Sequence, residues 1–159
     1  MRIPLSSPLH VPYVVVAVEP RSISRMVINL DAFRAVAARG DGTYGRLLIF
    51  AYARAGAGAE KLRVRMFAPL AGIFEDPATG SASGALGAYL ASLDPRADGE
   101  FRITIEQGVD MGRPSEINLR VFKSGGQVKS AKISGRCVHV MRGVLEVGCQ
   151  GRVKKLRHV

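Results

Sequence analysis

Short apolar runs alternate with turn residues along this chain, and most of the runs have the length of a β-strand. Val11–Val18 is apolar and β-branched, Gly45–Ala53 is mostly apolar, and Leu62–Ala68 alternates apolar with basic residues. The alternation recurs in Phe101–Glu106 and Glu116–Val121. Each of these patterns predicts a strand with one or both faces buried.

The last third continues the strand pattern. Gly125-Gly126 is typical of a hairpin turn, because glycine adopts the positive φ angles that such turns require. Three further runs are predicted to complete the sheet: Val128–Ser134, Arg136–Met141 and Val144–Val147. We expect Cys137, which lies in the second of these runs, to be buried.

Two segments predict helices. Asp31 is a good N-cap for a helix over Ala32–Arg39. The second segment, Gly80–Leu93, has no charged residue and almost no polar face. A helix that is apolar on all sides is buried on most of them. The sequence therefore predicts a single α+β domain, in which a curved, mostly antiparallel sheet wraps around the central helix Gly80–Leu93.

The composition suits a globular protein of one domain, with 159 residues of which 47% are hydrophobic. No apolar run approaches the roughly 20 residues that span a bilayer, and no signal-peptide stretch follows the N-terminus. We therefore expect a cytoplasmic protein without membrane contact. Residues 1–10 are predicted to be a leader and residues 149–159 a basic tail.

The formal net charge of +10 is concentrated near the C-terminus. Residues 111–159 contain 11 basic residues against two acidic ones, so they carry nine of the ten net charges. Such a surface attracts anions. The tail lacks interleaved aromatic residues, so we interpret it as a solvated terminus and expect no nucleic-acid partner; contact with an acidic protein stays open. The cysteines and histidines have no metal-ligand spacing, so no metal site is predicted.

The candidate chemistry lies between a strand-like run and the apolar helix, in the segment Glu75-Asp76-Pro77-Ala78-Thr79-Gly80-Ser81-Ala82. The first amides of a helix lack internal partners and its dipole favours negative charge, so this helix start can hold an anion. Asp76 can hold an ammonium group or move a proton. Each residue also has a structural interpretation, since Thr79 or Ser81 can serve only as an N-cap and Pro77 only as a turn former.

The flanks of this segment carry a family resemblance. Arg65–Phe74 leads into it and Leu86–Leu90 follows, and then come Gln107-Gly108, Gly112–Ser115 and Ile133–Arg136 in the expected order. Together these motifs resemble the phenazine-biosynthesis-like (PhzF-like) isomerase family, within the diaminopimelate epimerase-like fold.

The resemblance covers roughly Val11–Leu145 and implies a domain over residues 11–148. Members of that family run to about twice this length, with two similar halves around a cleft, and this chain resembles only the second half. The first half supplies the family's catalytic glutamate. Glu19, Glu60 and Glu75 are available here, but none of them lies in a motif that resembles the part of the family containing that glutamate.

By resemblance, the reaction is proton relocation on a small amino or hydroxy acid without a cofactor. Asp76 is then the catalytic residue, and Thr79, Gly80, Ser81 and Glu75 bind the anionic substrate, with the Gly80 and Ser81 amides holding its carboxylate. Related thiol racemases place a cysteine in the Thr-Gly turn. This turn has none, which argues against a two-thiol mechanism.

Three functions from different classes fit these observations. The first is an isomerase half that acts with a first-half partner chain or as a homodimer. The second is a carboxylate-binding remnant that has lost the catalytic base. The third is an interaction protein that uses its basic face. The intact motif favours the first.

Overall fold

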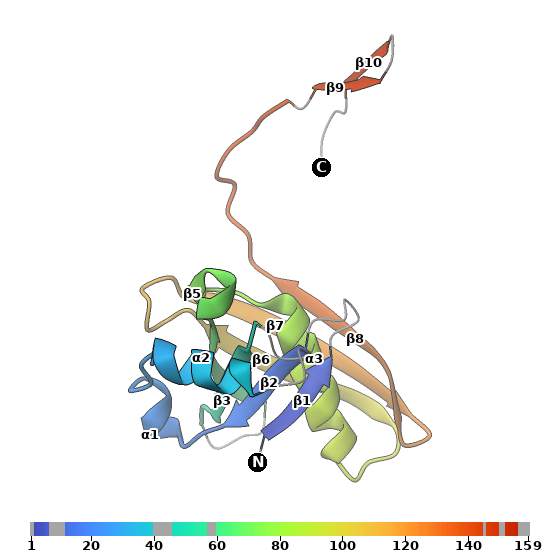
Figure 1. The fold of residues 1–159 in the computed structure, drawn as a ribbon. Helices are drawn as coiled ribbons and strands as arrows, with labels where there is room; N and C mark the ends of the chain where they lie inside the picture. The colour runs from blue at the N-terminus through green and yellow to red at the C-terminus, as the bar shows by residue number, and fades with distance from the viewer. Residues whose placement is uncertain are drawn as a thin grey trace.

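Eight strands form one curled, mixed sheet in the order β1-β2-β3-β4-β6-β7-β8, with β5 paired to β4 (Figure 1).

The computed structural model describes residues 2–6, 12–39, 46–56, 60–144, 146–149 and 152–155, and side chains within 12–39, 46–56 and 60–144. The strands are β1 (Arg2–Ser6), β2 (Pro12–Ala17), β3 (Leu48–Arg54), β4 (Lys61–Ala68), β5 (Ile73–Asp76), β6 (Gly99–Gln107), β7 (Ser115–Ser124) and β8 (Gln127–Gly135). The helices are α1 (Pro20–Ile23), α2 (Leu30–Ala38), the 3₁₀ turn η1 (Pro69–Ala71) and α3 (Gly80–Leu93).

The alternation in the sequence decides which face of each strand is buried. In β7, Ile117, Leu119 and Val121 point into the core, and the residues between them face outward. Because side chains alternate across a strand, one apolar set covers one face of the sheet. The sheet is mostly antiparallel, as predicted, and only β2–β3 and β4–β6 pair in parallel.

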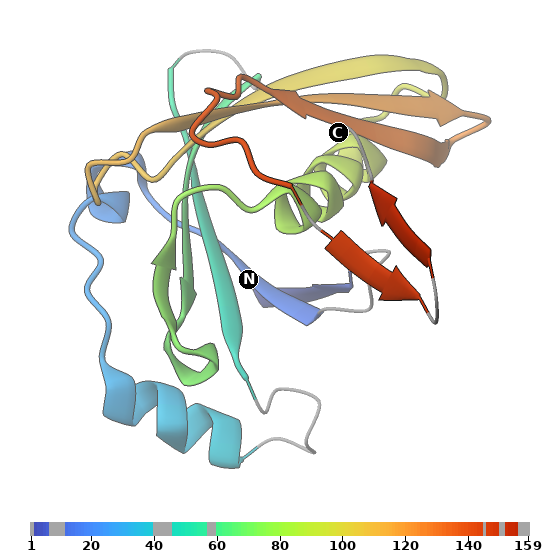
Figure 2. The same ribbon diagram turned by 90° about the horizontal axis from the view of Figure 1, so that it is seen from above.

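The two parallel pairs explain where the helices lie. Parallel strands need a crossover connection, which is usually helical. The β2–β3 crossover contains α1 and α2, and the β4–β6 crossover contains η1, β5 and α3. Figure 2 shows α3 inside the curl of the sheet and α2 outside it.

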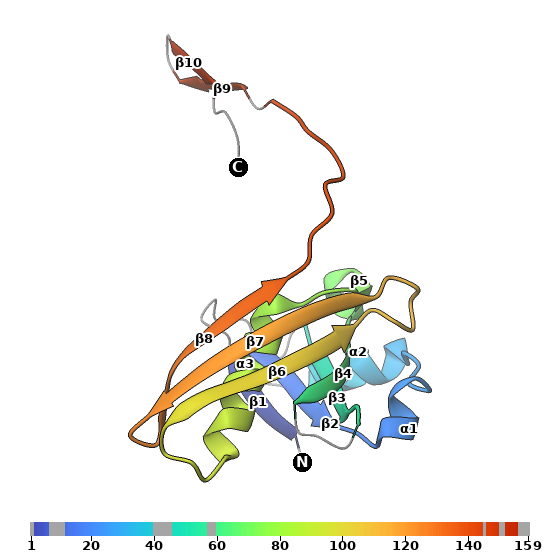
Figure 3. The same cartoon turned by 180° about the vertical axis from the view of Figure 1, so that it is seen from behind.

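Helix α3 is the centre of the main core, and the predicted arrangement of a sheet wrapped around an apolar helix is confirmed. Its Ala82 and Leu86 are fully buried, together with Phe50 of β3 and Ile105 of β6. Strands β6, β7 and β8 form the long antiparallel layer on one side of the helix (Figure 3). At Gly87 a Cβ atom would lie 2.8 Å from Leu119 Cδ1, so the missing side chain lets the helix approach β7 closely.

Helix α2 begins earlier than the sequence predicts. Its N-cap is Asn29, whose Oδ1 accepts a hydrogen bond of 3.0 Å from the Ala32 amide. The predicted N-cap, Asp31, lies inside the first turn and pairs with Arg34. Both residue types cap helices well, so propensity alone does not choose between positions 29 and 31.

The predicted strands over Arg136–Met141 and Val144–Val147 do not complete the main sheet. Residues 136–144 form no strand and are exposed, Cys137 included, and after β8 the chain runs away from the sheet (Figure 1). Val138 is 85% exposed. Strand β9 (Glu146–Cys149) pairs with β10 (Arg152–Lys155) instead. Alternation indicates which residues suit a strand, but a strand also needs a partner edge.

The two chain ends differ in part from the expected leader and tail. Residues 2–6 of the expected leader form β1, which pairs antiparallel with β2 from Arg2↔Val16 to Ser6↔Pro12. Residues 152–155 of the expected tail form β10. The other residues of both segments, apart from Cys149, lie outside the described part of the chain. No helix in the described residues is long and apolar enough to cross a membrane.

Lys123 of β7 closes the C-terminal end of α3. Its side chain is buried, and Nζ donates to the carbonyl oxygens of Ala91 at 3.2 Å and Asp94 at 2.6 Å. The Ala91 carbonyl also accepts from the Asp94 amide at 3.2 Å, so the ammonium group adds a second donor there and pairs the Asp94 carbonyl beside the core.

We predict that Lys123→Met lowers the free energy of unfolding by about 1–3 kcal/mol, because hydrogen bonds to a charged group are lost and two carbonyls lose a donor. Urea unfolding measures the change. The control is Lys129→Met, since Lys129 is exposed and bonds only the Gln127 side chain. Equal unfolding midpoints for the two variants would contradict this role of Lys123.

Candidate functional site

The ends of β5 and β6 meet on one edge of β4. The parallel strand β6 pairs with β4 as far as Val64↔Gln107, and the antiparallel strand β5 pairs with it from Ala68 back to Met66↔Asp76. The final residues of β5 and β6 therefore lie opposite β4 positions two residues apart. This topology brings Asp76 and Gln107 together, although 31 residues separate them in the chain.

Gln107 holds the turn between β5 and α3 by three hydrogen bonds. Its Nε2 donates to the Asp76 carbonyl oxygen at 2.7 Å and to Thr79 Oγ1 at 2.8 Å, and its Oε1 accepts from the Thr79 amide at 3.0 Å. The Gln107 side chain is completely buried. Buried polar groups are stable only when they are bonded, and here one side chain satisfies two backbone groups of the turn.

Thr79 organises the turn and has no free polar group for a substrate. Its hydroxyl donates to Asp76 Oδ2 at 2.6 Å, and its carbonyl accepts from the amide and the hydroxyl of Ser83. Its amide is bonded to Gln107. The sequence predicts Thr79 as a substrate-binding residue, but the structure places it as the N-cap of α3, with a hydroxyl that bonds Asp76 rather than the helix amides.

The amides of the first turn of α3 are open because the N-cap side chain does not occupy them. Within the described residues, no acceptor bonds the amides of Gly80 or Ser81. The Ser81 hydroxyl shares a hydrogen bond of 2.8 Å with the Tyr13 hydroxyl. Two open amides at the start of a 14-residue helix, together with one hydroxyl, are groups that can donate hydrogen bonds to an anion.

Glu75 points to a different partner from the one that the sequence predicts. Both of its carboxylate oxygens accept from Arg65, at 2.9 Å from Nε and 2.8 Å from Nη2. The Nη1 of Arg65 also donates to the carbonyls of Ile23 and Met26. A bidentate pair of this kind, with side chains 10% and 12% exposed, ties β5 to β4 and to the segment after α1. The geometry favours a structural role for Glu75.

Asp110 extends this cluster beyond the end of β6. Its Oδ2 lies 3.0 Å from Arg63 Nη2 and 3.8 Å from Arg65 Nε. Burial alone would raise the pKa of Asp110, but hydrogen bonds from Ser24 and Arg63 and the charge of Arg65 outweigh it, so the pKa lies below its usual value. The cluster links α1, β4 and the β6–β7 turn.

Gly108 lets the β6–β7 turn pass close to Pro77. Its φ angle is +75°, and a Cβ atom there would lie 2.3 Å from the Arg113 carbonyl oxygen and 3.0 Å from Pro77 Cα. Arg113 of this turn is exposed, and its amide donates to the Gly108 carbonyl. Gly108 therefore fixes the close approach of the turn to the candidate site.

Sequence reasoning missed three residues that support the site. Gln107 and Arg65 belong to motifs that carry the family resemblance, but the resemblance assigns neither of them a role. Tyr13 is predicted only as a strand residue. A signal for Gln107 is present, since it follows Phe101, Ile103 and Ile105 at a core-facing position of β6. A polar residue in a buried series needs a partner, which points to a nearby polar network.

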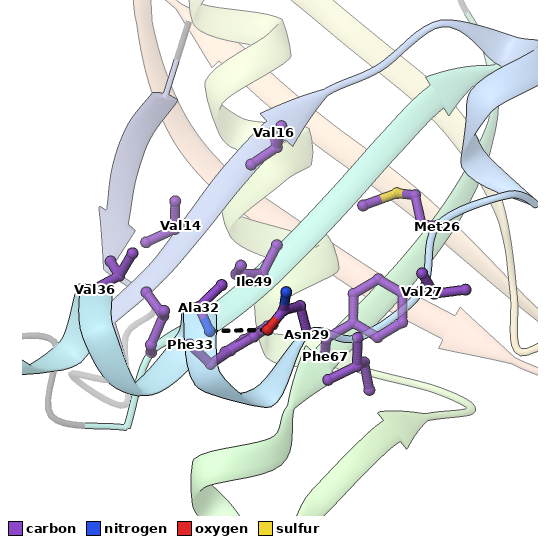
Figure 4. Close-up of a pocket in the computed structure, with 12 residues that line it drawn as sticks. Val14, Val16, Met26, Val27, Asn29, Ala32, Phe33, Val36, Ile49 and Phe67 are labelled. Atoms are coloured by element: carbon purple, nitrogen blue, oxygen red, sulfur yellow. Dashed lines mark hydrogen bonds between the residues drawn. The ribbon is translucent and has the colours of Figure 1, made fainter.

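An apolar cavity of about 480 Å³ lies on the opposite face of the sheet, under α2 (Figure 4). Val14 and Val16 of β2 line it, whereas the adjacent Tyr13 and Val15 face α3, so the cavity and the candidate site are on different faces. The cavity lining offers one polar side chain, Asn29, whose Oδ1 already caps α2. Within the described residues, no group of three His, Cys, Asp or Glu side chains is placed to hold a metal ion.

The comparison with known families gives the class of protein. The model of the family described as phenazine biosynthesis-like protein matches residues 12–143. The chain therefore belongs to that family. A solved protein of the same family from Bacillus anthracis shares the fold, with a TM-score of 0.58 and 23% identity over 80% of this chain.

Curated relatives are similar over about half of the chain. An uncharacterized isomerase of Mesorhizobium japonicum is 45% identical over 82 residues, which is 52% of this chain and 27% of that protein. The trans-2,3-dihydro-3-hydroxyanthranilate isomerase of Pseudomonas aeruginosa is 44% identical over 81 residues, 51% of this chain and 28% of the isomerase. The alignment with the Bacillus anthracis structure covers 46% of that chain. The match thus spans less than half of each of these proteins.

We predict that Gly108→Ala is more destabilising than Gly112→Ala. Both glycines have nearly the same φ angle, +75° and +74°, so both changes carry a similar backbone strain. Only at position 108 does the new methyl group meet backbone atoms. Thermal unfolding of the two variants measures the difference, and equal melting temperatures would show that the contact with Pro77 is not tight.

Asp110→Asn is expected to lower stability at pH 7 and to leave it nearly unchanged in acid. Because the folded pKa of Asp110 is lowered, its ionised form stabilises the fold above the unfolded pKa of about 3.9. That contribution is lost as the pH falls through the folded pKa. Urea unfolding of both proteins between neutral and acidic pH measures the difference in their free energies of unfolding, which should disappear in acid. A difference that stays constant with pH would contradict the ion pair as its cause.

Proposed function

We propose that this chain supplies the carboxylate-binding half of a cofactor-independent isomerase that relocates a proton on a small amino or hydroxy acid. The observation that carries this proposal is the junction of β5 with α3, where Asp76 is held beside the open amides of Gly80 and Ser81. Membership of the phenazine biosynthesis-like family and the isomerase names of its relatives support it.

The open amides serve the substrate carboxylate. Removing a proton beside a carboxylate develops negative charge on that group, and fixed donors at a helix start stabilise it without rearranging during the reaction. The Gly80 and Ser81 amides are such donors, and the Ser81 hydroxyl adds a third. Thr79 and Glu75, which the sequence places among the binding residues, hold the site in our proposal instead, because their polar groups are bonded within the protein.

Asp76 is the proposed catalytic residue. Its Oδ2 is fixed by the Thr79 hydroxyl at 2.6 Å, and no described residue donates to its Oδ1. One carboxylate oxygen is therefore available to orient an amino or hydroxyl group of the substrate or to share its proton. A second acid or base is needed to complete the relocation.

The complementary group comes from outside the described residues in our proposal. Either a partner chain that corresponds to the first half, or a second copy of this chain, completes the cleft. A two-fold pair is geometrically simple, because the same surface meets itself. In our proposal the chain takes the place of the second half, whose motifs it carries, and its candidate site forms one wall of that cleft.

We expect deuterium from D2O to enter small amino or hydroxy acids when this chain is mixed with a first-half protein. NMR of the recovered acids measures the incorporation. Asp76→Asn should slow it by about 100-fold or more, because a placed general acid or base is lost. Ser81→Ala should weaken substrate binding.

The matched control is Ser92→Ala on the same helix, because Ser92 is exposed and bonds only the Tyr89 carbonyl. Its rate should equal that of the unaltered chain. Absence of incorporation both with and without a first-half protein would refute the isomerase proposal. Carboxylate binding that depends on Ser81 without any incorporation would leave only a binding module.

A further inference from the structure

We infer that Gln107 is a positioning residue that sets the direction of the Thr79 hydroxyl, and that Asp76 therefore carries its proton on Oδ1. This inference rests on the proposed function, because it assigns the proton-carrying oxygen of the proposed catalytic residue. It adds a chain of two hydrogen bonds from the sheet to the reacting group: Gln107 Nε2 donates to Thr79 Oγ1, and Thr79 Oγ1 donates to Asp76 Oδ2.

The backbone fixes the orientation of the Gln107 amide. The two ends of a glutamine side chain look alike in shape, and only their partners distinguish them. One end faces the Thr79 amide at 3.0 Å, which can only donate, so this end must be the oxygen. The other faces the Asp76 carbonyl at 2.7 Å, which can only accept, so this end must be the nitrogen. No reversed orientation satisfies both groups.

The fixed amide then directs the Thr79 hydroxyl. Gln107 Nε2 has two protons and no acceptor capacity; one proton goes to the Asp76 carbonyl and the other to Thr79 Oγ1 at 2.8 Å. A hydroxyl has a single proton and two lone pairs, and one lone pair already accepts from Gln107. Because the ionised Asp76 carboxylate can only accept, the Thr79 proton points to Asp76 Oδ2, only 2.6 Å away.

The two carboxylate oxygens of Asp76 therefore have different roles. In the ionised carboxylate, Oδ2 accepts the Thr79 proton and is engaged by it. A proton taken from a substrate must then bind Oδ1, to which no described residue donates. Oδ1 is thus the oxygen that meets the substrate, and a fixed carboxylate geometry of this kind supports proton transfer.

Replacement of the amide by an acid would reverse the chain. In Gln107→Glu, an ionised carboxylate has no proton to give, so the Thr79 hydroxyl turns toward position 107 and Asp76 Oδ2 loses its donor. Because Gln107 is fully buried, this variant carries a desolvation cost and can fail to fold. Thr79→Val, which keeps the shape and removes only the hydroxyl, breaks the chain without a buried charge.

The first part of the experiment measures deuterium incorporation with the complementary half present. Both Thr79→Val and Gln107→Glu should lower kcat by about 100-fold with little change in KM, because the reacting carboxylate is misplaced while the amides that bind substrate remain. The matched control is Thr104→Val, on the same strand as Gln107, whose hydroxyl bonds only Asn118. If Thr79→Val and Gln107→Glu, when folded, both keep the kcat of the unaltered chain, the inference is overturned.

The second part does not depend on activity. NMR of 15N-labelled protein follows the exchange of the two Gln107 side-chain amide protons with solvent. Both should exchange slowly in the unaltered chain, and one should speed up in Thr79→Val; the exposed Gln127 serves as the fast-exchanging reference. If the unaltered chain shows no deuterium incorporation, the proposed function fails, and protected Gln107 protons still confirm the bond direction. Rapid exchange of both protons overturns the inference even when the chain is active.

Discussion

The pairing of β4 with two strands along one edge is the constraint on which the site depends. Strand β6 uses the first half of that edge in parallel, and β5 uses the second half in antiparallel. Because the two strands share the edge in this way, their final residues, Gln107 and Asp76, lie next to each other. A parallel pair also requires a crossover, and the crossover here contains α3. One topological choice thus places the helix start, the acid and the supporting glutamine together.

The buried polar residues divide the support of the site between two networks. Gln107 and Thr79 hold the turn that precedes α3, whereas Arg65 ties the Glu75 carboxylate to β4 and to the segment after α1. Neither network uses the amides of Gly80 and Ser81 or the Oδ1 of Asp76. A rigid support that leaves the reactive groups open is what preorganised binding of an anion requires. The Arg65 network is costly to interrupt because its charges are largely shielded from water.

The open amides and the single aspartate of the candidate site fit the proposal that it forms one part of a cleft. The match spans less than half of each of the relatives described above. At this site the described residues place one aspartate beside two open amides, and the proposed proton relocation needs a second group that gives or takes the proton on another face. The excess of basic residues in 111–159 attracts anions at long range, an effect that needs no specific contact.

The sequence by itself determined the local parts of this protein. Alternation located β4, β6 and β7, and the absence of charge located the buried helix over Gly80–Leu93, because periodicity reports which face meets the core. Only the tertiary structure decided the partners. It gave Glu75 to Arg65, Ser81 to Tyr13 and Thr79 to Gln107, and it left residues 136–144 without the sheet edge that their alternation suits. Contacts between residues far apart in the chain depend on strand order and register, which a local pattern does not encode.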